Sequence, residues 1–320
     1  MAGISRKRRQ STLLFPVGKC YTLPLLFICL TVDDAMNSTT AAVAEKSVDS
    51  LIKTIRIPPR PSLLADVQDE LAGSDPDPRR LSGLIANDVS MSASLLKLAN
   101  SPFYGLRLKA TSVEHAVQLI GMRQCGLVLT GIIARQSVQT EKMPLEQFWD
   151  FSTKRAQAMS YLASRMRVCP PDVAHTFGLF CDIGIPLLME RFEDYQATLD
   201  LAAEAREVRF TEVEQDRHST SHTSVGALMA RTWGLPEQVT SAILLHHDYS
   251  ALNDTATDDM VRALIALCVV AEFSIHKYHG RENQAEWDKG GAIACEFLGL
   301  THDELEDYFE ELHDIYSHVQ

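Results

Sequence analysis

The sequence predicts an all-α protein built as two helical lobes. Apolar residues recur with the 3.6-residue period of an amphipathic helix from residue 62 onward. Helix-start residues precede several of these segments. We find no alternating strand pattern bounded by hairpin turns. With 46% hydrophobic and 22% charged residues, the 320-residue chain has the composition of an ordinary globular protein.

The helices expected in the first lobe each have a start signal. Ser62 is expected to cap the first of them. Asp77 precedes Pro78, which suits the first helical position because its missing N–H has no partner to lose there. Ser90 is expected to start a third helix. Ser112 is expected to start a fourth, which Gly121 ends.

The second half of the chain has a linker at its start and a strong helix signal at its end. Residues 137–144 (SVQTEKMP) are polar and are expected to join the two lobes. Thr301–Glu304 reads as a capping box, in which Thr301 and Glu304 each bond the other's backbone N–H. The stripe that follows is expected to pack on the protein's own core and consists of Leu305, Phe309, Leu312, Ile315 and Val319.

Residues 1–48 are expected to be an N-terminal extension with a signal-like composition. Arg6–Arg9 precedes the apolar run Tyr21–Val32, whose 12 residues fall short of the about 20 that span a bilayer. The alternatives are an over-extended start with Met36 as the true first residue, a disordered tail, or an export signal. The first two are favoured. We therefore expect a cytoplasmic protein with no membrane span, in keeping with seven cysteines and no CxxC pair.

The charge distribution argues against nucleic acid as a partner. The net charge is −12, and residues 1–35 carry five basic and two acidic residues, or +3. The rest of the chain therefore carries −15. Nucleic acid selects clustered Lys and Arg, so an acidic body of this kind is a poor match.

Several first-lobe motifs occur in a fixed order: Ile57–Pro61, Leu84–Gly105, Thr111–Val113 and Ala116–Gly121. In this order they resemble the HDOD (HD-related output domain) family, a divergent branch of the HD metal-dependent phosphohydrolase superfamily. The long motif contains the run Leu98-Ala99-Asn100-Ser101, which matches the family's Leu-Ala-Asn-Ser.

Second-lobe motifs extend the resemblance, which covers about residues 52–275. Phe148–Ser152 is similar to the family's Phe-Trp-x-His-Ser, with Phe151 in place of His. Gly178–Gly184 is similar to Gly-Leu-Leu-His-Asp-Ile-Gly, with Cys181 in place of His. The remaining matches are His222–Pro236, a stretch that ends in Trp-Gly-Leu-Pro, and Ala242–His247, which is similar to Ile-x-x-His-His.

The resemblance implies a two-lobed HDOD helical fold whose second lobe is a degenerate HD-like lobe. We expect the HDOD domain at residues 49–275, with lobes at about 49–140 and 141–275. Residues 276–320 are expected to complete the helical body. The resemblance also implies a role in bacterial signal transduction.

The resemblance further implies a vestigial metal site. Asp182, His222, His247 and Glu272 are the candidate ligands, and His246 could add another imidazole. HD-type hydrolysis needs metals that polarise a phosphate and activate water. Phe151 cannot bind a metal, and sulfur from Cys181 suits Zn²⁺ better than Mg²⁺ or Mn²⁺. We therefore expect no confident catalytic residue, no cofactor, and at most a weakly bound divalent metal.

Three interpretations of these residues stay open: a buried hydrogen-bond network, which is favoured, a weak metal site, and a working hydrolase. We accordingly expect a non-catalytic regulatory module that binds signalling proteins or a small signal molecule. The alternative is a weakly active metal-dependent phosphohydrolase or phosphodiesterase. The sequence leaves the oligomeric state open.

Overall fold

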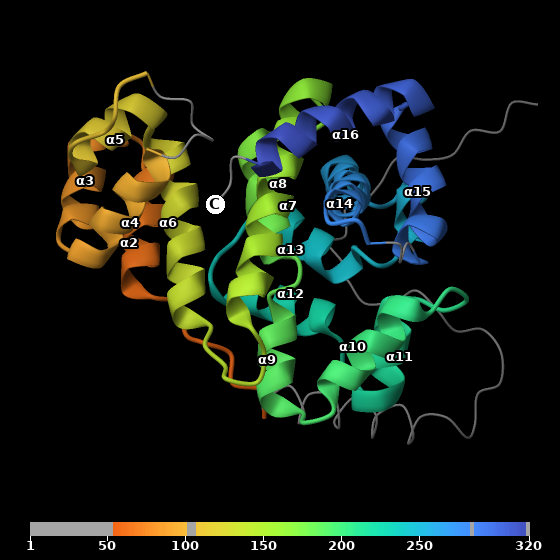
Figure 1. Ribbon diagram of the computed structural model, residues 1–320. Coiled ribbons are helices and arrows are strands. Elements are labelled where there is room, and N and C mark those ends of the chain that lie inside the picture. The colour runs from red at the N-terminus through yellow and green to blue at the C-terminus, as the bar shows by residue number, and fades with distance from the viewer. Residues whose placement is uncertain (1–53, 101–106, 282–284, 318–320) are drawn as a thin grey trace, which may run out of the picture. The chain divides into compact units, whose positions relative to one another are not determined.

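A computed structural model describes residues 54–100, 107–281 and 285–317 of the chain (Figure 1). These residues form helices joined by turns, with no strand among them, which confirms the all-α prediction. All of the described residues belong to one compact unit, Glu45–Gln320. The signal-like run Tyr21–Val32 lies outside the described residues.

The first lobe is a set of short helices that close around their own apolar core. Its helix α6 contacts α2, α4 and α5, while α3 packs on α5. The core side chains with no exposed surface include Leu64, Leu81, Ile85, Leu95 and Leu129. The five helices are α2 (Ser62–Ala72), α3 (Pro78–Ala86), α4 (Val89–Ala99), α5 (Val113–Ile120) and α6 (Met122–Ser137).

Two of the predicted helix starts are confirmed and two are wrong. The Asp77 carboxylate accepts a hydrogen bond from the Arg79 N–H, and the Ser112 hydroxyl accepts one from the His115 N–H. Asp88, not Ser90, caps α4, because its carboxylate reaches the Met91 N–H at 3.0 Å. α2 begins after Pro61 with no side-chain cap, so Ser62 is its first residue and not its cap.

Asn100, from the long first-lobe motif, ties the end of α4 to the segment before α5. Its side-chain amide donates to the Ala110 carbonyl at 2.9 Å and accepts from the Ala110 N–H at 2.7 Å. The pair of bonds satisfies both backbone groups of Ala110, which lies outside the helices.

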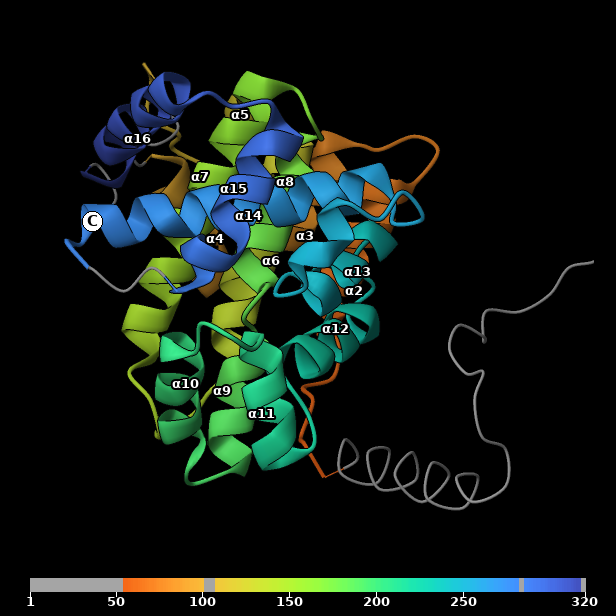
Figure 2. The same cartoon turned by 90° about the vertical axis from the view of Figure 1, so that its right-hand side faces the viewer.

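The second lobe centres on its longest helix, α7, and on the two helices that pack along it. Helix α7 packs along α8 and α14, and α12 packs on both α9 and α13 (Figure 1). Helix α10 packs on α11 and also contacts α9, and Figure 2 shows these three helices at the bottom of the view. The elements are α7 (Leu145–Met166), α8 (Pro171–Phe180), α9 (Gly184–Arg191), α10 (Tyr195–Glu204), α11 (Phe210–His218), α12 (His222–Thr232), α13 (Glu237–Leu245), the 3₁₀ turn η2 (Tyr249–Leu252) and α14 (Asp259–Tyr278).

Gly184 allows the starts of α9 and α12 to lie close together. A β-carbon placed on Gly184 would lie 2.1 Å from the carbonyl oxygen of His222. Only a residue without a side chain therefore lets the start of α9 touch the start of α12. This contact brings Asp182 and His222, 40 positions apart in the sequence, to the same place.

The last two helices, α15 (Ala285–Leu298) and α16 (His302–Ser317), lie against α14, and α16 also touches α7. The capping box of α16 is confirmed: the Glu304 N–H donates to the Thr301 hydroxyl, and the Thr301 N–H donates to the Glu304 carboxylate. Leu305, Phe309 and Leu312 are buried, as the predicted stripe requires, while Val319 lies outside the described residues.

One described stretch, Pro171–Arg191, is long and apolar enough to cross a membrane. It comprises α8, a turn and α9, and 78% of its most apolar 18 residues are buried inside the fold. The pair α5 and α6 qualifies only if the 118° bend between the two helices is disregarded. Buried core helices have the same length and composition, so neither stretch indicates a membrane span.

Candidate metal centre

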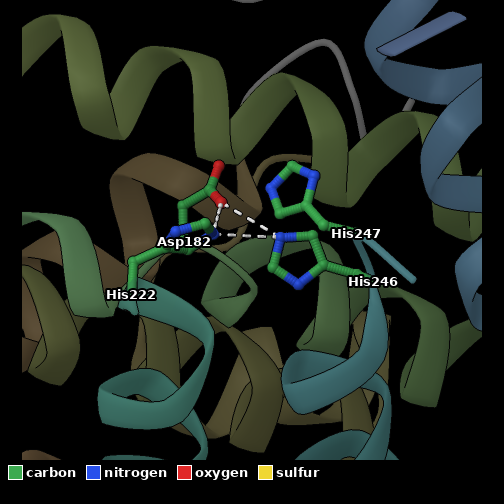
Figure 3. Close-up of side chains that lie close together, drawn as sticks. All are labelled: Asp182, His222, His246 and His247. Atoms are coloured by element: carbon green, nitrogen blue, oxygen red, sulfur yellow. Dashed lines mark hydrogen bonds and ion pairs between the residues drawn. The ribbon is translucent and has the colours of Figure 1, made fainter. Parts of the chain in front are cut away.

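Three segments of the second lobe bring a carboxylate and three imidazoles together. Asp182 lies in the turn between α8 and α9, His222 is the first residue of α12, and His246 and His247 follow α13. Each offers one ligand atom, and these atoms all lie within 4.8 Å of one another. Figure 3 shows the Asp182 carboxylate joined to the rings of His222 and His246, with the His247 ring beside them.

At the centre of the cluster, one carboxylate oxygen lies close to two ring nitrogens. Asp182 Oδ1 is 3.4 Å from His222 Nε2 and 3.4 Å from His246 Nε2. The same two nitrogens are 3.3 Å apart. Two imidazole nitrogens this close, without an ion, need a shared proton between them.

Each of the three imidazole rings forms a hydrogen bond through its Nδ1 atom. Nδ1 of His222 lies 2.8 Å from a Glu214 oxygen, and Nδ1 of His247 lies 2.9 Å from Glu286. Nδ1 of His246 lies 2.8 Å from the Ile243 carbonyl oxygen, which can only accept. These partners assign the Nδ1 proton to each ring and leave Nε2 as the nitrogen available to a metal.

Glu214, on α11, is a site residue that sequence reasoning missed. It is fully buried, accepts from the His222 backbone N–H at 3.1 Å, and also bonds the Tyr195 hydroxyl. Burial raises the pKa of Glu214, but the neighbouring His222 outweighs this effect and lowers it. No sequence signal separates Glu214 from the half-buried Glu212 on the same polar helix.

Glu286, on α15, is the second residue missed. Besides His247, it accepts from the Tyr249 hydroxyl at 2.5 Å and pairs with Lys289. Burial raises the pKa of Glu286, but the His247 contact and the hydrogen bonds hold it well below its usual value. Segment 276–320 therefore contributes a side chain to the site in addition to completing the helical body.

The acidic neighbours change the protonation of His222. Burial lowers its pKa, but Glu214 and Asp182 overcome this effect and raise the pKa of His222 to about 10. The pKa of His246 is lowered, by burial and then by His247. His222 thus supplies the shared proton, and a metal entering the cluster would replace it.

A buried arginine occupies the other side of Asp182. Arg155, on α7, has no exposed surface. Its Nη1 donates to Asp182 Oδ2 at 2.5 Å and to Glu272 Oε1 at 2.6 Å, and its Nε donates to the Gly178 carbonyl at 2.9 Å. The guanidinium carbon lies 5.4 Å from the centre of the Phe151 ring.

The charges of this group stabilise one another. Burial raises the pKa of Asp182, but Arg155 and then the histidines hold it well below its usual range. Burial lowers the pKa of Arg155, but Asp182 outweighs this and raises it. Arg155 was detectable in the sequence, because it stands one helical turn after Phe151 between apolar positions, where a charged residue needs a buried partner.

The candidate ligands thus divide into two groups. Asp182, His222 and His247 lie together, joined by His246. Glu272 faces Arg155 instead, and its carboxylate forms a second group with the sulfurs of Cys181 and Cys268, also within 4.8 Å of one another. Phe151 offers no ligand atom and lines the adjacent cavity.

A cavity of about 390 Å³ reaches both groups. Its polar lining includes Asp182, His222, His247, Glu272 and Glu286. Aromatic rings form much of the remaining wall, from Phe151, Phe210, Tyr249, Phe273 and Trp287.

The imidazole cluster fits one divalent transition metal. Three neutral imidazole nitrogens and one carboxylate oxygen form a donor set typical of Zn²⁺, Fe²⁺ or Mn²⁺ sites. The Nδ1 contacts to Glu214, Glu286 and the Ile243 carbonyl are the outer contacts that such ligands usually have. His222, His246, His247 and Asp182 would hold the ion, which would act there as a Lewis acid.

Solved structures with the same fold come from several bacteria. An HDOD domain protein of unknown function from Geobacter sulfurreducens matches with a TM-score of 0.66 and 18% identity, over 88% of this chain and 99% of that one. A protein from Shewanella amazonensis, provisionally described as a phosphohydrolase, matches with a TM-score of 0.65 and 20% identity, over 87% and 98%. A protein from Marinobacter aquaeolei, provisionally described as a signal transduction protein, gives 0.61 and 18%, over 88% and 66%.

Sequence comparison assigns the family. An uncharacterized protein from Treponema pallidum (strain Nichols) is 25% identical over 197 residues, which is 60% of this chain and 38% of that relative's length. The HDOD domain model matches residues 57–249, more than half of the 320 residues. Helices, motifs and family model agree, and the chain belongs to the HDOD domain family.

Proposed function

We propose that this HDOD domain is a regulatory module of a signalling system, which binds a small signal molecule or a partner protein and does not hydrolyse a phosphoester. The observation that carries the proposal is the buried guanidinium of Arg155 between Asp182 and Glu272. Hydrolysis in a metal-dependent site requires carboxylates that are free to hold an ion and position water. Here the buried Arg155 guanidinium occupies one oxygen of each carboxylate, which leaves only Asp182 Oδ1 to face the imidazole cluster.

The cavity supports the binding of a small molecule. Its volume of about 390 Å³ lies within the usual range for small-molecule sites, and its wall combines aromatic rings with a few polar groups. Of the solved structures with this fold, one is described as a phosphohydrolase and another as a signal transduction protein, so the fold is compatible with either role.

A turnover assay tests the regulatory proposal. The full chain is incubated with Mg²⁺, Mn²⁺, Fe²⁺ or Zn²⁺ and with a cyclic dinucleotide or an aryl phosphodiester. We expect no hydrolysis above that of the Asp182→Asn variant. Hydrolysis that Asp182→Asn abolishes and that a surface variant, His313→Ala, retains would overturn the proposal.

The second candidate function is hydrolysis at a single metal ion. The three rings fixed at Nδ1 favour it, because an accidental hydrogen-bond network has no need to hold every Nε2 ready for a ligand. Elemental analysis after gentle purification distinguishes the possibilities. Metal with turnover supports the enzyme, metal without turnover supports a regulatory metal site, and folded protein without metal supports the hydrogen-bond network.

The partners and the location of the protein belong to the same proposal. The acidic body argues for proteins or small signals as partners and against nucleic acid. We propose a cytoplasmic protein without a membrane span, and N-terminal sequencing of the native protein tests this proposal. A start at Met36 supports it, whereas cleavage after Ala44 would indicate export.

A further inference from the structure

A second group of ligand-type side chains lies beside the imidazole cluster. Cys181, Cys268 and Glu272 place their ligand atoms within 4.8 Å of one another. The Cys268 sulfur is 3.6 Å from Glu272 Oε1, the same oxygen that accepts from Arg155. Sulfur and carboxylate ligands at such distances are the donor set of a Zn²⁺ site.

We propose that Arg155 stands in for a second metal ion, and that it keeps the group of Cys181, Cys268 and Glu272 closed to divalent cations. The number of ions that the site accepts is separate from the question of hydrolysis. The proposed function can therefore fail while this proposal holds, and the reverse.

The geometry of Arg155 supports this role. A single nitrogen, Nη1, contacts one oxygen from each of two carboxylates, at 2.5 and 2.6 Å. A metal ion at this place would be held by the same two carboxylates, Asp182 and Glu272. A divalent ion bound to both oxygens would have to displace Nη1 and would be repelled by the guanidinium charge.

Two further contacts hold the guanidinium in place. Its Nε donates to the Gly178 carbonyl at 2.9 Å, which fixes the plane of the group. The Phe151 ring lies 5.4 Å from its central carbon, a distance at which an aromatic ring attracts a cation. Phe151 offers no metal ligand, and its ring instead helps to hold the Arg155 guanidinium in place.

Asp182 connects the two halves of the site. Its Oδ2 is taken by Arg155, and its Oδ1 stays with the nitrogens of His222 and His246. One oxygen of the carboxylate is thus available to a metal in the imidazole cluster. The structure therefore predicts a site for one ion, with a fixed positive charge at the place of the other.

Cobalt titration of the full chain tests the proposal directly. Co²⁺ bound to cysteine sulfur shows a thiolate-to-metal charge-transfer absorption, which Co²⁺ bound to imidazole and carboxylate does not. We expect wild type to show no such absorption and to bind at most about one equivalent. Wild type that shows the thiolate absorption, or that binds two equivalents tightly, would overturn the proposal.

Variants at Arg155 provide the converse measurement. Arg155→Met should gain about one equivalent of Co²⁺ relative to wild type, together with the thiolate absorption. Arg155→Lys, which retains a cation, should gain neither. The absorption should be lost again in the triple variant that also carries Cys181→Ser and Cys268→Ser.

The folding of each variant is checked by circular dichroism in chelator before titration. If Arg155→Met does not fold, Arg155→Gln takes its place, because its amide can still bond the Gly178 carbonyl. A folded Arg155 variant, without a cation at this position, that gains no metal overturns the proposal. Uptake that persists after both cysteines are replaced also contradicts it.

Discussion

The two oxygens of the Asp182 carboxylate lie next to two different kinds of positively charged group. Oδ1 faces His222 and His246, whose ring nitrogens can hold a proton or a metal ion. Oδ2 faces Arg155, whose charge is part of the chain. Both sides are deeply buried, since His222 and Arg155 have no exposed surface.

This difference determines which half of the site can change its charge when the metal or proton concentration changes. On the imidazole side the positive charge is exchangeable, so the binding of a metal and the concentration of protons affect each other. On the arginine side the positive charge is permanent, so it does not depend on a metal or, in the ordinary pH range, on the proton concentration. Variants on each side should therefore change different measured quantities.

Removal of the permanent charge should have the largest effect. In chelator, Arg155→Met leaves the Asp182 and Glu272 carboxylates without their cation, and breaking a buried pair costs about 3–5 kcal/mol. Urea denaturation measures the loss in the free energy of unfolding. Arg123→Met is the matched control, because the Arg123 and Asp172 side chains are 84% and 28% exposed, and surface pairs of this kind contribute less than about 1 kcal/mol. Equal losses in the two variants would contradict the role of Arg155.

The next largest effect is expected on metal affinity, from Glu214→Gln. In Glu214→Gln the amide oxygen can still accept from the His222 backbone N–H, but the amide carries no charge, and its NH2 group replaces the oxygen that lies 2.8 Å from His222 Nδ1. Loss of such an outer contact weakens metal binding by about 10–100-fold. Competition with a chromophoric chelator measures the Zn²⁺ affinity. Glu212→Gln, on the same helix with a side chain 44% exposed and outside the cluster, should leave the affinity unchanged. An unchanged value in Glu214→Gln would favour a hydrogen-bond network without a metal role.

A smaller effect is expected from Glu286→Gln on α15. Glu286 is 23% exposed, so water can replace part of its contact with His247 Nδ1. We expect the Zn²⁺ affinity to fall about tenfold, the lower end for such contacts. The same substitution in a His247→Ala background should have no further effect. A full additional loss there would show that Glu286 acts by another route.

The helical fold could be predicted because its signals are local. Asp77, Ser112 and Thr301 each bond a backbone N–H two or three residues away, so a short window of sequence contains both partners. The start of α4 was misplaced because two polar residues, Asp88 and Ser90, compete over three positions. Only the structure shows that the carboxylate of Asp88 reaches Met91.

The site could be predicted only in part, because its missing members depend on long-range packing. Asp182, His222 and His247 could be identified because each lies in a segment that resembles a motif of the family. Arg155 meets its partners 27 and 117 positions away, and no local pattern gives those pairings. The role of Glu272 could not be decided by residue type, since a carboxylate pairs equally well with a metal or a guanidinium.

Glu272→Gln should have the smallest effect, and it tests that remaining ambiguity. Its amide oxygen can still accept from Arg155, which keeps the Asp182 contact, so the free energy of unfolding should fall by only about 1 kcal/mol. The Zn²⁺ affinity of the imidazole cluster should stay at the wild-type value, because Glu272 contacts Arg155 and the Cys268 sulfur instead of the cluster. Asp182→Asn, measured in the same titration, should weaken Zn²⁺ binding. If Glu272→Gln weakened it as much, Glu272 would bind the same ion as the histidines, as the sequence motifs imply, and Arg155 would have to move aside when that ion binds.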